Sequence, residues 1–212
     1  RAMVMPASFL VVLFYAIYLV VRNGVISYQK ASGLAMFSGI VIFCFYSFIR
    51  LKEMLPVEEY GYDAIFFILL ILCFAWGGDT CAYFAGRAFG KHKLCPVVSP
   101  KKTVEGAVGG VLGTMVFGVL VTVIYSIAAD RMEEFTRSNI GVSMYVIIAL
   151  LACVAAVLGI YGDLFASVVK RQCGIKDYGT IFPGHGGILD RFDSVMFIAP
   201  FVTMVVIAAF YD

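Results

Sequence analysis

Six long apolar stretches occupy most of this chain, and they constrain its fold more than any other feature. A lipid bilayer has a hydrocarbon core about 30 Å thick, which a helix of roughly 20 apolar residues can span. Inside lipid every backbone polar group must be satisfied internally, and an unbroken helix does this. We therefore expect six spanning helices. They are Met3–Val21, Gly33–Ile49, Ala64–Ala85, Val104–Ala128, Val142–Val169 and Ser194–Tyr211.

The composition agrees with a membrane protein and excludes a soluble domain. Of the 212 residues, 62% are hydrophobic and 14% are charged, whereas a soluble domain is about half apolar and about a quarter charged. A water-soluble fold of this length has too little interior to hide so much apolar surface. The sequence thus predicts an all-α, polytopic integral membrane helical bundle with about six transmembrane helices, in which residues 1–212 form a single membrane domain.

The distribution of basic residues predicts how the helices are oriented. With six spans, 11 of the 16 lysines and arginines fall in loops on one side of the membrane. The positive-inside rule places that side in the cytoplasm, so we expect an inner-membrane protein with both termini outside. The net charge is only +2, and no basic tail indicates a nucleic-acid partner.

Acidic residues in apolar surroundings indicate where the function lies. Carboxylates near the bilayer interior are costly, so they usually face a partner or an aqueous cavity. Asp79 and Asp163 lie inside apolar stretches, and Asp190 and Asp193 lie three residues apart where the last stretch begins. The helix dipole would explain one aspartate at a helix start. Because all four belong to the expected cytoplasmic side, we predict a shared site.

A glycine-rich turn and several basic residues accompany these carboxylates. The run Pro183-Gly184-His185-Gly186-Gly187 cannot continue a helix, but its backbone N–H groups can approach an anion closely. Magnesium takes oxygen ligands, usually one or two carboxylates together with substrate phosphates. We expect two cytoplasm-facing active-site regions, residues 76–106 and 159–194. The expected metal ligands are Asp79, Asp163, Asp190 and Asp193.

The fourth apolar stretch carries two overlapping pairs of glycines, Gly106/Gly110 and Gly109/Gly113. Small residues at this spacing let helix backbones approach closely in lipid. We expect these glycines to serve helix packing and to take no part in catalysis.

Two motifs resemble those of a known family. The first begins at Ser167 and reads S-x-x-K-R, then four residues, then K-D-x-G-x-x-F-P-x-H-G-G-x-x-D-R-x-D, ending at Asp193. The second is Ser99-Pro100-Lys101-Lys102-Thr103-x-Glu105-Gly106. With Asp79, these segments resemble the phosphatidate cytidylyltransferases (CDP-diacylglycerol synthases), particularly the bacterial form. The first two apolar stretches carry no signature, and the family commonly has more N-terminal spans.

The resemblance implies a Mg²⁺-dependent reaction of phospholipid biosynthesis, in which CTP and phosphatidate give CDP-diacylglycerol and pyrophosphate. It also suggests a homodimer, and it leaves the number of metal ions and the acyl-chain preference open. The implied catalytic residues are Asp190, Asp193, Lys170, Arg171 and His185. The implied phosphate-binding residues are Ser99, Lys101, Lys102, Ser167, Lys176, Gly186, Gly187 and Arg191. The sequence does not divide the basic residues between lipid and nucleotide, and His185 has a structural role in the turn as an alternative.

Three other functions stay open at this stage. A related CDP-archaeol synthase would use an archaeal ether-lipid phosphate with the same site chemistry. A polyprenol or phytol kinase would transfer the γ-phosphoryl group to an alcohol and release nucleoside diphosphate. A transporter would explain charge within the membrane, but the acidic residues crowd one membrane side and form no relay across the bilayer.

Overall fold

The structure is a computed structural model that describes residues 13–18, 20–21, 28–131, 141–181 and 186–210. The chain divides into two units, Arg1–Ile42 and Phe43–Asp212. In the first unit the described residues are helical and include the start of α2 (Tyr28–Met54). All candidate site residues belong to the second unit, and the prediction of a single membrane domain stays a prediction.

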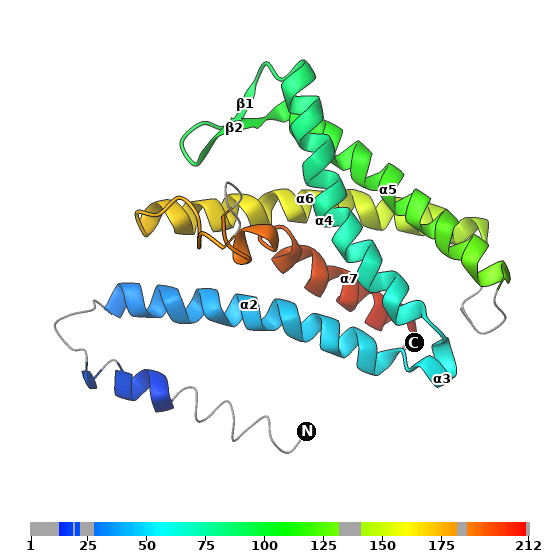
Figure 1. The fold of residues 1–212 in the computed structure, drawn as a ribbon, viewed down its shortest axis with the longest axis horizontal. Coiled ribbons are helices and arrows are strands. Elements are labelled where there is room, and N and C mark those ends of the chain that lie inside the picture. The colour runs from blue at the N-terminus through cyan, green and yellow to red at the C-terminus, as the bar shows by residue number, and fades with distance from the viewer. Residues whose placement is uncertain (1–12, 19, 22–27, 132–140, 182–185, 211–212) are drawn as a thin grey trace. The chain divides into compact units, whose positions relative to one another are not determined.

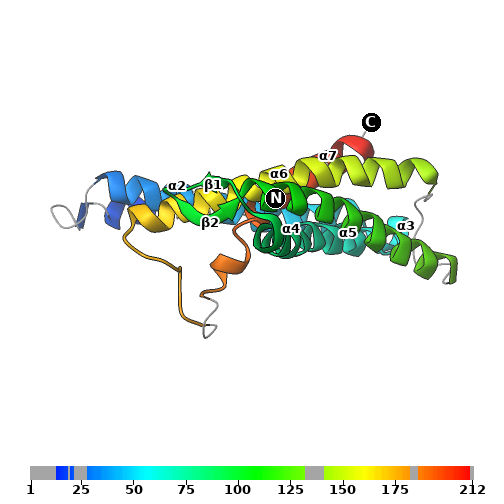
Figure 2. The ribbon, with the colours of Figure 1, turned by 90° about the horizontal axis from the view of Figure 1, so that it is seen from above.

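The second unit is built almost entirely from helices (Figure 1). Its long helices after α2 are α4 (Asp63–Phe89), α5 (Val104–Arg131), α6 (Val142–Gln172) and α7 (Val195–Phe210). Two short ones, α3 (Val57–Tyr60) and the 3-10 helix η1 (Leu189–Arg191), lie in the connections. Figure 2 shows residues 173–181 leaving the end of α6 on one side of the helices.

Four of the described helices, α2, α4, α5 and α6, are long and apolar enough to cross a membrane. Helix α7 is apolar but has only 16 residues. These findings confirm the prediction of an all-α polytopic membrane protein. The count of six spans stays a prediction, because much of Met3–Val21 lies outside the described residues.

Side chains of α4, α6 and α7 form the core of the second unit. Phe74, Ile148, Ile198 and Val202 are fully or almost fully buried. Large apolar side chains elsewhere on the same helices are exposed, as expected of surfaces that face lipid chains. The core therefore holds the helices together, while the outward faces suit a bilayer.

Helices α4 and α5 pack through small residues, as predicted. A Cβ atom on Gly106 would lie 2.8 Å from the carbonyl oxygen of Ala82, and one on Gly110 would lie 3.0 Å from the Cβ of Ala82. Any larger side chain at Gly106 would push the two backbones apart. The packing role expected for these glycines is confirmed.

The connection between α4 and α5 contains a two-stranded antiparallel hairpin, where the sequence indicated only a loop. Strand β1 (Lys93–Cys95) pairs with β2 (Ser99–Thr103), with Lys93 opposite Thr103 and Cys95 opposite Ser99. Figure 1 shows the hairpin at the end of the unit where α4 ends and α5 begins. Strand β2 runs directly into α5, so its lysines have a defined place beside the helices.

Candidate functional site

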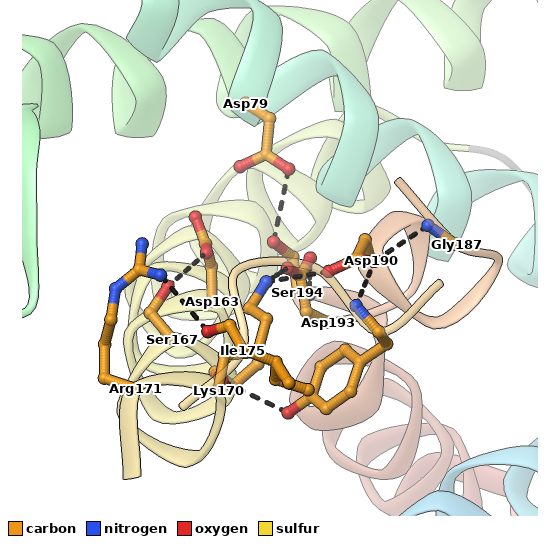
Figure 3. A network of polar contacts seen from close by, with 12 residues as sticks. Asp79, Asp163, Ser167, Lys170, Arg171, Ile175, Gly187, Asp190, Asp193 and Ser194 are labelled. Atoms are coloured by element: carbon orange, nitrogen blue, oxygen red, sulfur yellow. Dashed lines mark hydrogen bonds and ion pairs between the residues drawn. The ribbon is translucent and has the colours of Figure 1, made fainter. Parts of the chain in front are cut away.

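Three carboxylates from different elements lie around the same region of the second unit (Figure 3). Asp79 comes from α4 and accepts a hydrogen bond of 3.2 Å from the Ser194 hydroxyl. Asp163 comes from α6, and Asp193 lies just before α7. Burial raises the pKa of Asp193 to about 7, and the negative charges of Asp163 and Asp79 add to the increase. Positive charge beside these carboxylates would therefore stabilise their ionised forms.

Lys170 supplies part of that charge from the last turn of α6. Its Nζ atom lies 2.8 Å from Oδ1 of Asp190 and 3.9 Å from Oδ2 of Asp193. The side chain is buried, and its ammonium group also lies 5.2 Å from the ring centre of Tyr178. A buried ammonium is stable here because carboxylates on two sides compensate its charge.

Asp190 fixes the glycine-rich segment. Its Oδ2 atom accepts hydrogen bonds of 2.8 Å from the amides of Tyr178 and Gly187, while Oδ1 accepts from Lys170. Burial opposes ionisation of Asp190, but these hydrogen bonds outweigh it and hold the pKa below its ordinary value. Gly186 has φ +81°, and a Cβ atom there would lie 2.9 Å from Asp190 Oδ2. Only glycine suits this position.

A second lysine reaches the cluster from the hairpin. The Lys102 ammonium pairs with Oδ2 of Asp163, and the Ser167 hydroxyl donates to Oδ1 of the same residue at 3.4 Å. Both partners of the ion pair are about three-quarters buried, with side-chain exposures of 25% and 22%. The contact joins β2 to α6, so the two predicted active-site regions meet.

The structure does not bring every predicted site residue to the carboxylates. Arg171 donates to the carbonyl oxygen of Ile175 at 3.3 Å and is exposed. Ser99 belongs to the hairpin pairing, and among the described residues no ion pair joins Lys101 or Lys176 to the cluster. The side chain of Arg191 is exposed, but it lies close enough to Asp79 for the two charges to interact. His185 lies outside the described residues, so its predicted role stays a prediction.

The metal site also stays a prediction. In the described ranges no three acidic, cysteine or histidine residues are gathered closely enough to hold a metal ion with the side chains as they stand. The ion pairs give a physical reason, because Lys102 and Lys170 already contact the carboxylates that a cation would need.

Sequence reasoning missed several residues that shape the site. Ser194 hydrogen-bonds Asp79, and Trp76 donates from Nε1 to the carbonyl oxygen of Arg191 at 3.1 Å. Tyr178 contributes its amide to Asp190 and its hydroxyl to the carbonyl oxygen of Ala166. Ser194 directly follows the motif, so its position in the sequence could have indicated it. Backbone amides that act as donors cannot be identified from residue types.

Comparisons with known proteins give a consistent result. The model of the cytidylyltransferase family matches residues 2–209. A phosphatidate cytidylyltransferase of Bacillus subtilis (strain 168) is 32% identical over 198 residues, which cover 93% of this chain and 66% of that protein. Phosphatidate cytidylyltransferases of Staphylococcus haemolyticus and Staphylococcus epidermidis are 39% and 42% identical over 145 residues, 68% of this chain and 50% of theirs. The chain thus spans between half and just under two thirds of the length of these curated relatives.

Proposed function

This chain belongs to the cytidylyltransferase family, and on that premise we propose that it transfers a cytidylyl group from CTP to phosphatidate. The products are CDP-diacylglycerol and pyrophosphate. The observation that carries the proposal is the cluster of Asp79, Asp163 and Asp193, faced by two lysines, among long apolar helices. The printed names of the relatives, all phosphatidate cytidylyltransferases, support the choice of substrate.

The reaction suits a site that is rich in charge, and it needs no protein nucleophile. A phosphate oxygen of phosphatidate attacks the α-phosphorus of CTP, and the bond from that phosphorus to the bridging oxygen of the β-phosphate breaks. The nucleophile is ionised near neutral pH, so no strong base is required. Repulsion between the anions must instead be reduced and the leaving pyrophosphate stabilised. Lys170 and Lys102 are placed to do this, because both ammonium groups already lie among the carboxylates.

A magnesium ion fits the donor set, since carboxylate oxygens are its preferred protein ligands. Asp79, Asp163 and Asp193 would hold it, because the charges of Asp79 and Asp163 both act on Asp193. When bound, the ion would neutralise phosphate charge. Lys102 and Lys170 would then exchange carboxylate contacts for substrate phosphates.

Asp190 is proposed to act by a different route from Asp193. Its oxygens already accept from two amides and one ammonium group. These contacts favour a role in holding the segments around Tyr178 and Gly187 in place over direct metal ligation. Gly186 and Gly187 would then present their backbone amides to a substrate phosphate. Ser167 would present its hydroxyl to the same group.

We further propose that the protein lies in the cell membrane and that its site faces the cytoplasm. The support is the excess of lysine and arginine in the loops that carry the site residues. The homodimer suggested by the family resemblance stays a prediction.

Product analysis tests the proposed reaction. Purified protein in lipid nanodiscs is incubated with CTP, phosphatidate and Mg²⁺, and both products are identified. CDP-lipid with pyrophosphate in equal amounts is expected, and Asp193→Asn serves as the inactive control. Release of CDP with a phosphorylated alcohol, when a polyprenol or phytol is offered instead, would contradict the proposal and indicate a kinase.

A further inference from the structure

Glu105 lies in the first turn of α5 and has no part in the reaction as proposed. Its carboxylate accepts hydrogen bonds from the amides of Lys91 at 3.0 Å and His92 at 3.2 Å. The Nδ1 atom of His92 lies 2.7 Å from the other carboxylate oxygen. All of these contacts come from the two residues that lead from the end of α4 into β1.

The contacts that Glu105 makes with Lys91 and His92 also close the base of the hairpin, beside other hydrogen bonds. The amide of Val104 donates to the carbonyl oxygen of His92 at 2.9 Å, beside the pairing of Lys93 with Thr103. The Thr103 hydroxyl accepts from the amide of Gly106 at 3.1 Å and so caps the start of α5. Glu105 therefore ties the segment that enters β1 to α5, the helix into which β2 runs.

Lys102 depends on this arrangement for its position. It lies three residues before Glu105, on the strand whose end the closed base fixes, and its ammonium group pairs with Asp163. Its neighbour Lys101 points elsewhere, since it is exposed and forms no ion pair with the cluster among the described residues. Successive side chains of a strand lie on opposite faces. A slip of one residue in the pairing of β1 with β2 would therefore exchange the faces of Lys101 and Lys102.

We propose that Glu105 is a positioning residue that closes the base of the β1–β2 hairpin and thereby delivers Lys102 to Asp163. For its effect on turnover this inference rests on the proposed function. The competing role for Glu105 is a simple favourable charge at the N-terminus of α5. That role would affect helix stability slightly and would not act through Lys102.

A double-mutant cycle separates the two roles. We expect Glu105→Ala to lower kcat/KM about tenfold, the effect of losing hydrogen bonds to a charged group. In a Lys102→Ala background the same change should cost less than about twofold, because residues that act through one another are not additive. Equal factors in both backgrounds would overturn the proposal. Glu105→Gln keeps one acceptor oxygen and should retain most activity. Glu53→Ala, which removes an exposed carboxylate paired with Arg50, should leave turnover unchanged.

A second measurement does not require turnover. Cys95 lies on β1 and is only partly exposed, so its alkylation by a maleimide reports whether the hairpin is closed. Mass spectrometry of the peptide containing Cys95 should show about fivefold faster labelling in Glu105→Ala, because local opening exposes the group. Glu105→Gln and Glu53→Ala should label at the original rate. An unchanged rate in a folded Glu105→Ala variant refutes the closing role.

The two measurements also separate this inference from the proposed function. If the unaltered protein gives no CDP-lipid, the proposed function fails while the labelling result still decides the role of Glu105. If the protein is active but the cycle is additive, only the positioning role fails.

Discussion

The charge balance of the candidate site depends on single residues whose surroundings differ sharply. Asp190 and Asp193 lie three residues apart, yet Asp190 is held by two amides and Lys170, whereas Asp193 is buried near two other carboxylates. Substituting Asp190 and substituting Asp193 should therefore impair activity in different ways.

We predict that Asp193→Asn nearly abolishes turnover and raises the Mg²⁺ concentration for half-maximal activity, since it removes a charged ligand. Asp190→Asn should lower kcat without shifting that concentration, because its loss loosens the segment that includes Gly187. Initial rates over a Mg²⁺ titration measure both effects. A shift of the same size in both variants would place Asp190 among the metal ligands.

Lys102 and Lys101 provide a second comparison at this scale. Lys102→Met removes the cation that pairs with Asp163, so Mn²⁺, used as a spectroscopic probe, should bind about threefold to tenfold more tightly in the absence of nucleotide. Turnover should fall nonetheless, because a phosphate contact is lost. Lys101→Met is the matched control and should leave Mn²⁺ affinity unchanged. Electron paramagnetic resonance of free Mn²⁺ gives both affinities, and equal affinities for all three proteins would contradict the competition.

At the scale of elements, the long helices could be predicted and the short connections could not. Expected and observed helices agree closely from α4 onward because each apolar stretch is long and bounded by polar residues. The hairpin joins two strands of three and five residues with no clear apolar alternation. Its contact between Lys102 and Asp163 follows from register and packing. The amides that hold Asp190 could not be predicted from the sequence either. The carboxylates themselves could be identified from their apolar surroundings.

The packing of α4 on α5 leads to a prediction at the same scale. Gly106→Val would place a side chain against the carbonyl oxygen of Ala82, and such overpacking costs about 1–3 kcal/mol. We expect a lower Tm together with weaker activity, because α5 also carries the end of the hairpin. Val108→Leu, at a site 55% exposed on the same helix, should change neither. Thermal unfolding in detergent measures the effect, and an unaltered Tm for Gly106→Val would show that the helices can separate without cost.

At the scale of the whole molecule, helix lengths predict that the site lies near a membrane surface. Helix α6 has 31 residues, which corresponds to about 46 Å at 1.5 Å per residue and exceeds a hydrocarbon core of about 30 Å. Its last turn carries Lys170 and Arg171, so this end is expected to project into water. The Lys102–Asp163 contact then requires the hairpin to lie on the same side of the membrane.

Labelling with a membrane-impermeant maleimide tests this topology. Cys173 is exposed directly after α6, and Val97→Cys would place a thiol where the present side chain is 92% exposed on the hairpin. Positions 97 and 173 should react in inverted membrane vesicles and not in intact cells, whereas Glu58→Cys, in the connection before α4, should show the opposite pattern. Mass spectrometry of labelled peptides distinguishes these thiols from the other cysteines. Reaction of both positions from the outer face would reverse the orientation but leave the site intact. Reaction of positions 97 and 173 from opposite faces would refute the site itself, because Lys102 and Asp163 could not meet across a bilayer.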